Sequence, residues 1–184
     1  MRMPLKSKVS PNQASPIQDA ADFDRLYART HLIVFRYIYG LHGGPTEDVE
    51  DLTTDTFIRA WKSRHRFRGD NSAALGWLLK IARNLVIDVH RRYAKHSQNL
   101  DIEQHFIPHP DLGPEDKAAH QEQLQILWRL LVQLPTQQRE MIVLRYLLGW
   151  QVRVIATHLD MAENTVSVNL RRILERLRRE WPES

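Results

Sequence analysis

Residues 134–181 read LPTQQREMIVLRYLLGWQVRVIATHLDMAENTVSVNLRRILERLRREW, and they decide the fold of the last third of the chain. Apolar residues recur there every three or four positions in three blocks, which is the spacing of a buried helix face. Only residues 160–163 separate the last two blocks, so two helices must cross steeply, with small Ala156 at the crossing. The stretch predicts a helix-turn-helix. The expected buried stripe consists of Met141, Leu144, Leu148, Val152, Ile155, Ala156, Leu159, Val166, Leu170, Ile173, Leu174, Leu177 and Trp181.

The last helix of this stretch carries a polar face opposite its apolar one. Its polar residues step by four, three and four positions and so share that face: Thr165, Asn169, Arg172 and Arg176. Such a helix can enter a major groove of DNA, with short polar side chains toward base edges and arginines toward phosphates. A small helical bundle with a solvated arginine face is the alternative that this segment alone leaves open.

Composition limits the other possibilities. The chain has 184 residues, few glycines and no strand-like alternation, which favours an all-α protein of one domain or two small ones. It has no cysteine, no run long and apolar enough to span a membrane, and no signal-peptide core near its start, so we expect a cytoplasmic protein without membrane insertion. The net charge is only +4, but the charges are sorted along the chain.

The first half predicts three helices that close a core. Residues 1–18 carry three prolines and no periodicity, and we expect a flexible tail without an assigned function. A first helix begins at Asp19 or Asp22 and ends at Gly43-Gly44, a second is capped by Pro45-Thr46, and a third, over about 73–92, is capped by Asn71 or Ser72. The first helix should bury Phe23, Leu26, Tyr27, Val34, Tyr37, Ile38 and Leu41.

Residues 93–115 interrupt the helical pattern with three prolines, and their length is unusual for a loop inside one compact domain. A fourth helix is expected over about 115–133. We therefore predict two small helical domains, residues 19–93 and residues 123–184, joined by a flexible linker of residues 94–122.

The second helix opens with a run of acids. Glu47, Asp51 and Asp55 align at a spacing of four, and no basic residue appears before Arg59. One or two acids would satisfy the helix dipole, and like charges at this spacing repel. A docking face for a basic partner and a merely solvated face are both compatible with this run.

The charge then changes sign. Residues 59–92 carry nine lysines and arginines, against only Asp70 and Asp88, and the aromatic residues Trp61, Phe67 and Trp77 lie among them. Cations neutralise phosphates and rings stack on unpaired bases, so the pattern is typical of single-stranded nucleic-acid binding. The alternative is that these rings belong to the core, which we favour for Trp61.

Several motifs in this order resemble a known family. They are DVEDLTTDTFIRAW at residues 48–61, Phe67-Arg68-Gly69, and GWLLKIARN at residues 76–84. Leu134-Pro135, Arg139, Leu144-Arg145-Tyr146, Ile155-Ala156 and Thr165-Val166 follow them. Over about residues 19–92 and 123–181 the chain resembles regions two and four of bacterial sigma factors of the extracytoplasmic-function (ECF) type, within the sigma-70 family.

The resemblance implies a subunit that gives RNA polymerase its promoter specificity and helps to open the −10 element. Its second helix would bind the clamp helices of the polymerase β′ subunit through Asp48, Glu50, Asp51, Asp55, Phe57 and Arg59. The single-stranded −10 element, with one base flipped out, would contact Arg64, Arg66, Phe67, Arg68, Asn71, Trp77, Lys80, Arg83 and Asn84. The duplex −35 element would contact Asn164, Thr165, Ser167, Asn169, Arg171, Arg172 and Arg176. Region four would also touch the polymerase β flap, the linker would run toward the active site, and an anti-sigma factor is an expected partner.

The chain departs from the family pattern at a few positions. Asp160 stands where glycine is common in the turn, and Asn164 where glycine often precedes Thr-Val. Both residue types tolerate left-handed backbone, so we expect the turn to survive. Ser167 and Asn169 replace frequent basic residues, which predicts an unusual −35 sequence.

No residue pattern indicates catalysis, a metal site or a cofactor. The nine histidines are scattered, and His105 and His109 lie among prolines, where their spacing of four has no helical meaning. Two other functions remain open at this point. A helix-turn-helix regulator that never joins the polymerase would explain residues 134–181 but not residues 46–92. An interaction protein that sequesters a partner would use the acidic helix without DNA.

Overall fold

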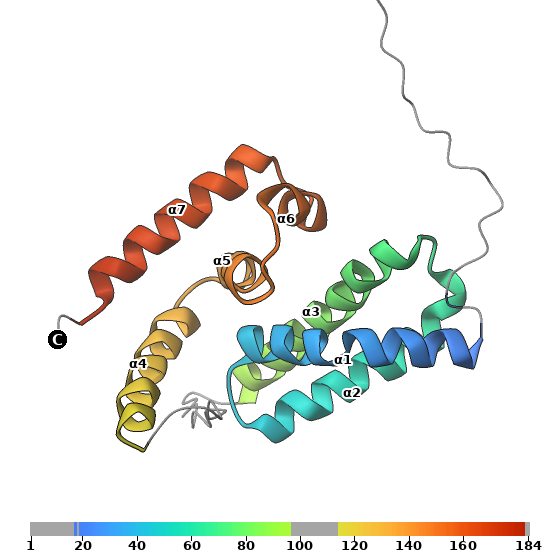
Figure 1. The fold of residues 1–184 in the computed structure, drawn as a ribbon, viewed down its shortest axis with the longest axis horizontal. Coiled ribbons are helices and arrows are strands. Elements are labelled where there is room, and N and C mark those ends of the chain that lie inside the picture. The colour runs from blue at the N-terminus through green and yellow to red at the C-terminus, as the bar shows by residue number, and fades with distance from the viewer. Residues whose placement is uncertain (1–16, 18, 97–113, 183–184) are drawn as a thin grey trace, which may run out of the picture.

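The computed structural model describes residues 17, 19–96 and 114–182, and all regular structure in these ranges is helical (Figure 1), as the sequence predicts. The elements are α1 (Ala20–His42), α2 (Thr46–Ser63), the 3₁₀ turn η1 (Arg64–Arg66), α3 (Asn71–His96), α4 (Pro114–Val132), α5 (Thr136–Ile142), the π-helical turn η2 (Val143–Leu147), α6 (Val152–Leu159) and α7 (Glu163–Glu180). They form two helical groups, which we call the first bundle (α1–α3) and the second bundle (α4–α7).

In the first bundle, α1, α2 and α3 pack against one another. Asp19 caps α1, because its carboxylate accepts a hydrogen bond of 2.8 Å from the backbone N–H of Asp22. Gly43 and Gly44 have φ of 57° and 127° and end the helix at the predicted place. These backbone angles suit glycine because it lacks a Cβ.

Three details of the first bundle correct the sequence prediction. Pro45 precedes α2 and no side chain caps that helix, so Thr46 only begins it. Asp70, and neither Asn71 nor Ser72, caps α3 by accepting a hydrogen bond of 2.9 Å from the N–H of Ala73. The helix begins earlier than predicted, which places Asp70 one residue before it, where a carboxylate reaches the third N–H.

The predicted tail and the buried side of α1 also need correction. Ile17, assigned to the tail, is 2% exposed and belongs to the core, whereas residues 1–16 and 18 lie outside the described residues. Tyr27 was expected to be buried but is 46% exposed. Its ring meets that of Phe57 edge-on at the rim of the bundle, with 4.8 Å between centroids, so one side remains in solvent.

The second bundle contains the predicted helix-turn-helix, formed by α6 and α7. Asp160 ends α6 in the left-handed conformation, with φ 54° and ψ 51°, as expected for the residue that replaces a turn glycine. The core of this motif consists of Ile155, Ala156, Val166, Leu170 and Ile173.

The predicted linker of residues 94–122 includes the last residues of α3 and the first part of α4. α3 continues to His96, and α4 begins at Pro114. Proline suits a first helical position, because its φ is already helical and its missing N–H would have no helical partner. Residues 97–113 lie outside the described residues.

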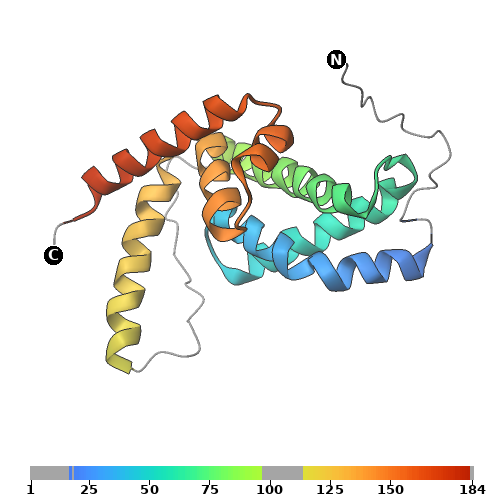
Figure 2. The ribbon, with the colours of Figure 1, turned by 45° about the horizontal axis from the view of Figure 1, so that its top comes forward.

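The two bundles share an interface on which α5 and η2 lie against α1 (Figure 2). Gly40 of α1 allows this close approach, since a Cβ at this position would lie 2.7 Å from Cγ2 of Val143. The buried apolar residues of both bundles therefore form one cluster.

Candidate nucleic-acid interface

A short segment, residues 64–70, connects α2 to α3 and carries much of the basic charge. Phe67 turns inward, is 5% exposed, and packs against Trp77 with 4.9 Å between ring centroids. Arg64 lies over the ring of Trp61 at 3.6 Å, and Arg68 donates to the carbonyl of His65 at 2.7 Å. The segment is thus folded by its own aromatic and arginine contacts.

A hollow of about 970 Å³ lies beside this segment, between the two bundles. Five predicted −10 residues line it together: Arg66, Phe67, Arg68, Trp77 and Lys80. The opposite wall comes from the second bundle, from Trp150, Arg153, Val154, Thr157 and His158. The lining of the hollow therefore combines cations with aromatic rings, which suits an anionic, aromatic ligand such as nucleic acid.

The remaining predicted −10 residues lie elsewhere. Asn84 is exposed on α3, and the side chain of Asn71 lies outside the described residues. Arg83 faces the second bundle, where its Nε donates to Oε2 of Glu140 at 2.6 Å. Arg64 is half-buried against Trp61. The aromatic rings of Trp61 and Phe67 therefore serve mainly in packing.

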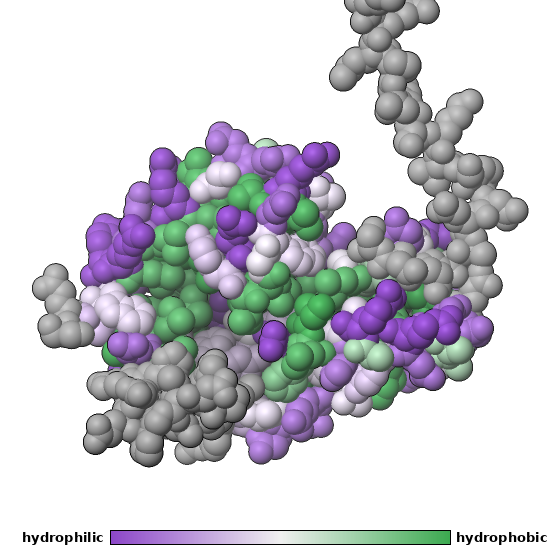
Figure 3. All heavy atoms as spheres, viewed as in Figure 1, coloured by the Kyte–Doolittle hydropathy of each residue, from purple (hydrophilic) through white to green (hydrophobic). Residues whose placement is uncertain are grey.

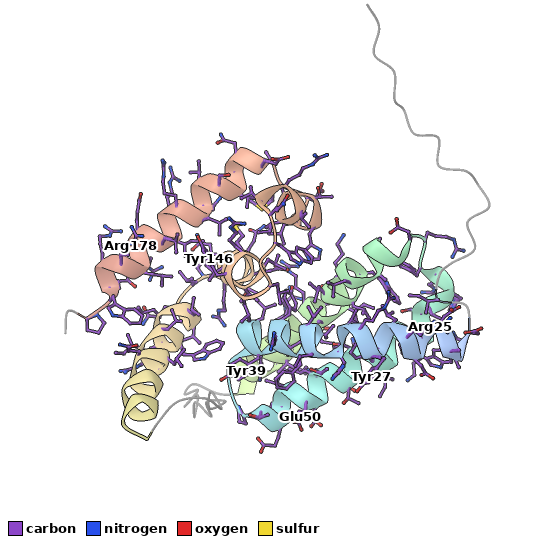
Figure 4. The ribbon with its side chains drawn as sticks, viewed as in Figure 1. Arg25, Tyr27, Tyr39, Glu50, Tyr146 and Arg178 are labelled. Carbon is purple, nitrogen blue, oxygen red and sulfur yellow. The ribbon has the colours of Figure 1, made fainter. Side chains whose placement is uncertain are left out.

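The acidic side of α2 forms a separate surface. Glu50, Asp51 and Asp55 are exposed, and in the described part of the chain no basic side chain pairs with them. Glu50 lies on the outer side of α2 (Figure 4). Asp48 is half-buried, with its carboxylate 3.8 Å from Nε2 of His42. We call the residues Glu50, Asp51 and Asp55 the acidic face.

The two other residues predicted to bind polymerase, Phe57 and Arg59, differ from each other in exposure. Arg59 is exposed on α2. Phe57 is only 5% exposed and packs against the rings of Phe23 and Tyr27. Its assignment as a contact residue is corrected, because Phe57 lies on the side of α2 that faces the core.

The recognition helix α7 presents the predicted −35 residues on its outer side. Asn164, Thr165, Ser167, Arg171 and Arg172 are exposed. The amide of Asn169 donates to the carbonyl of Thr165 at 2.8 Å, and Arg176 pairs with Glu180 at 2.8 Å. Neither interaction involves another helix, so both side chains can turn to a ligand.

Apolar surface marks the junction of the bundles. On the face shown in Figure 3, apolar side chains gather over the junction of α1 with α5 and along the inner side of α7. Tyr146 and Leu147 of η2 are 57% and 48% exposed. The described surface is therefore sorted into acidic, basic and apolar parts.

Sequence reasoning missed the buried charges between the bundles. Arg139 is 7% exposed and Glu140 is fully buried. Arg139 had only matched a family pattern, and Glu140 had no assigned role. A charge pattern gives no sign of burial when the covering residues come from a distant segment, so no local signal could have found these two.

Three histidines lie near this interface: His42 is buried, and His90 and His158 are half-buried. Burial lowers the pKa of His158 to about 4, helped by the positive charges of Lys80 and Arg83. Its Nε2 has no hydrogen-bond partner and lies 3.8 Å from Glu140. Burial also lowers the pKa of His90 to about 4 and, to a smaller extent, that of His42, whose Nδ1 lies 3.2 Å from Nε2 of His90. These rings are therefore neutral at pH 7.

Acid should consequently destabilise the fold. As the pH falls, the unfolded chain binds these protons near pH 6.5, whereas the folded chain binds them only near pH 4. The contribution of the neutral histidines to the free energy of unfolding is therefore fully present above pH 6.5 and is lost between about pH 6.5 and 4. Each histidine contributes at most about 1.4 kcal/mol per pH unit. We expect thermal melting temperatures to fall from pH 7 to pH 5, and to fall less in a His90→Gln, His158→Gln variant. The exposed His31→Gln serves as control, and an equal fall in all three proteins would contradict this origin.

In the described ranges, no group of three or more histidine, aspartate or glutamate side chains could hold a metal ion. None of the described helices has the length and apolarity needed to cross a membrane.

Comparisons with known proteins find two family models on the chain. Sigma-70 region 2 matches residues 26–96, and Sigma-70, region 4 matches residues 124–177. The ECF RNA polymerase sigma factor SigL of Mycobacterium tuberculosis is 30% identical over 160 residues, which cover 87% of this chain and 89% of the relative. The ECF RNA polymerase sigma factor SigX of Bacillus subtilis is 28% identical over 161 residues, covering 85% and 82%.

Two solved structures share the fold. The sigma factor RpoE from Bartonella quintana, in complex with the anti-sigma factor NepR, aligns with a TM-score of 0.68 at 24% identity, covering 88% of this chain and 97% of that one. CnrH, in complex with the cytosolic domain of CnrY, aligns with a TM-score of 0.63 at 23% identity, covering 89% of both chains.

Proposed function

We propose that this chain, which belongs to the ECF type of RNA polymerase sigma factors in the sigma-70 family, binds core polymerase and promoter DNA through separate surfaces. The observation that carries the proposal is the sorting of charge. The acidic face on α2 has no ion pair among the described residues, and cations with aromatic rings surround the hollow beside residues 64–70. An acidic face suits a protein partner with basic residues, and a basic one suits DNA. We assign the protein no catalytic step.

The acidic face would bind the clamp helices of the polymerase β′ subunit, with Asp48 and Arg59 at its margins. Both aspartates, Asp51 and Asp55, lie on the exposed side of α2, where they are solvated at little cost and can pair with a partner. Their lack of internal ion pairs in the described structure supports a role in binding.

The basic residues around the hollow would bind the unpaired strand of the −10 element. Lys80, Arg66 and Arg68 can neutralise phosphates, and Trp77, half-buried over Phe67, offers a ring for stacking. Binding of unpaired bases would offset the unstacking cost of a few kcal/mol, roughly, so opening needs no hydrolysis.

The recognition helix α7 would bind the duplex −35 element through its major groove, and the second bundle would also touch the polymerase β flap. We place region two at residues 19–93 and region four at residues 123–184. The structures of RpoE and CnrH contain partner proteins, which supports an anti-sigma factor as a further partner of this chain. All these partners imply that the protein acts in the cytoplasm.

Reconstitution with core RNA polymerase tests this proposal. We expect the purified chain to co-elute with core enzyme and to start transcription at discrete sites on fragmented genomic DNA, where core enzyme alone does not. Duplex DNA binding without core binding would instead favour a helix-turn-helix regulator. Core binding without any initiation would favour a sequestering partner protein.

The −35 element should be read by few direct base contacts. Asn169 is half-buried on the outer side of α7, and its amide can exchange the bond to Thr165 for N6 and N7 of an adenine. We expect Asn169→Ala to lose about 1–3 kcal/mol of binding and its preference at one adenine. Arg172→Ala should weaken binding to all DNA sequences alike and make the affinity less dependent on salt, because it removes a phosphate contact. Binding-site selection on both variants decides this, and an unchanged Asn169→Ala profile would mean that this amide reads no base.

A further inference from the structure

A groove between α1 and α2 leaves apolar side chains uncovered on the outside of the first bundle. This α1–α2 groove has a volume of about 360 Å³, and the described residues that line it all belong to these two helices. They include Ile58 and the aromatic rings of Phe23, Tyr27, Phe57 and Trp61. Tyr27 and Ile58 are 46% and 44% exposed, and Tyr27 lies on the side of the first bundle that faces away from α7 (Figure 4). Because these apolar residues adjoin one another, they indicate a binding surface.

The groove continues into the acidic face. Asp51, Asp55 and Ile58 are spaced by four and three residues on α2 and so share one side of that helix. Asp24 lines the groove from α1 and is exposed. None of these three carboxylates has an ion pair in the described part of the chain. Together the groove and the acidic face suit a segment that carries both apolar and basic side chains.

Such a segment stands at the start of this same chain. Residues 1–16, which we call the N-terminal tail, contain no acid and three cations: Arg2, Lys6 and Lys8. Four large apolar side chains accompany these cations: Met1, Met3, Leu5 and Val9. The tail lies outside the described residues, but Ile17, which follows it, is buried in the core shortly before the groove residue Ala20. The tail therefore joins the fold close to one end of the α1–α2 groove.

The tail is also long enough to reach the acids. Phe23 meets Trp61 with 5.1 Å between ring centroids, and Tyr27 meets Phe57 at 4.8 Å, so α1 and α2 run in opposite directions. From Trp61 to Asp51, α2 rises about 15 Å at about 1.5 Å per residue. An extended chain covers about 3.3 Å per residue, so about five residues of the tail span this distance. The other residues of the tail leave room for the turn that reverses the chain before α1.

We propose that the N-terminal tail binds the α1–α2 groove and the acidic face of its own chain, and so competes with core RNA polymerase for α2. Leu5 and Val9 fill the groove, and the cations of the tail pair with the carboxylates around it. Exposed ion pairs contribute little one at a time, but attachment to the same chain keeps the local concentration of the tail high. This inference rests on the proposed binding of polymerase by the acidic face. The free protein then binds core polymerase more weakly than it would without the tail.

Engineered cysteines locate the tail without any use of polymerase, because the chain has no cysteine of its own. Under mild oxidation, we expect Ser7→Cys, Ile58→Cys to form an intramolecular disulfide at least ten-fold faster than Ser7→Cys, Arg29→Cys, as followed on non-reducing gels. Arg29 is the matched control, since it is exposed on another side of α1. Equal rates would overturn the proposal. A disulfide-linked dimer formed in preference would assign the groove to a second copy of the chain and overturn it as well.

Charge removal tests both the docking and the competition. The neutral-tail variant replaces the three cations: Arg2→Gln, Lys6→Gln and Lys8→Gln. Added to both cysteine pairs, it should bring the ratio of the two disulfide rates close to one. In the chain without cysteines, it should bind core polymerase about ten-fold more tightly than the wild type, equivalent to about 1.4 kcal/mol. The matched variant removes three exposed arginines of α1 and α3 and should bind core enzyme like the wild type: Arg29→Gln, Arg36→Gln and Arg91→Gln.

The two measurements separate the tail from the proposed function. If the neutral-tail variant binds core enzyme no more tightly than the wild type, the competition is wrong. If Ile58→Gln then weakens core binding, polymerase itself occupies the groove and the proposal is overturned. If the wild-type chain binds no core enzyme at all, the proposed function fails, whereas a faster disulfide at position 58 would still support docking of the tail in the groove.

Discussion

Reversing two charges of the acidic face, with Asp51→Arg and Asp55→Arg, is expected to abolish binding to core RNA polymerase. Both side chains are exposed on α2, and neither pairs with a basic residue within the described structure. Close charge pairs across protein interfaces couple by about 1.5–7 kcal/mol, so replacing attraction with repulsion at two positions should cost at least about a hundredfold in affinity. Titration of labelled protein with core enzyme measures the loss.

The fold itself should tolerate this change. Asp51 and Asp55 repel each other weakly at their spacing of four, and arginine is a good helix former, so the melting temperature should stay nearly constant. Asp88→Arg, on the exposed side of α3, is the matched control and should retain core binding. Parallel loss of binding and of thermal stability in the double variant would show that these acids are structural.

Local features of the fold could be predicted from the sequence. The apolar stripe of α7 and the left-handed turn at Asp160 follow from residues within a few positions of each other. The end of α1 at Gly43 follows from the same local chemistry. The candidate site was predictable to the extent that it is also local, as for the basic residues of the 64–70 segment and the acids of α2.

Contacts between distant segments were not predictable in this way. The hydroxyl of Tyr37 and the carboxylate of Glu140 are 103 residues apart in the chain, and their burial depends on how two bundles meet. Arg83 looked like a free cation because its partner comes from α5. Phe57 was assigned as a contact residue only through the family resemblance, whereas its ring lies in the core, as the helical spacing of apolar residues predicts.

Arg139→Met is expected to cause the largest loss of stability. The guanidinium is 7% exposed and donates to four carbonyls, of Leu41, Leu131, Val132 and Leu134. The carbonyls of Leu41, Leu131 and Val132 lie in the last turns of α1 and α4, where helix dipoles favour a positive charge, and that of Leu134 follows α4. Methionine fills similar space but leaves the carbonyls without this donor, and hydrogen bonds to charged groups contribute about 1.5–3 kcal/mol each.

We therefore expect Arg139→Met to lower the free energy of unfolding by at least about 3 kcal/mol, which is a large part of a small protein's stability. Urea unfolding followed by tryptophan fluorescence measures this. Arg145→Met is the matched control, because Arg145 is half-buried and donates only to the carbonyl of Trp150, at 2.9 Å, within the described structure. We expect Arg145→Met to lower the free energy of unfolding by about 1–3 kcal/mol less than Arg139→Met does, because it removes one hydrogen bond instead of four. Equal losses in the two variants would mean that Arg139 stabilises the chain by its packing volume, and that its bonds to the ends of α1 and α4 contribute little.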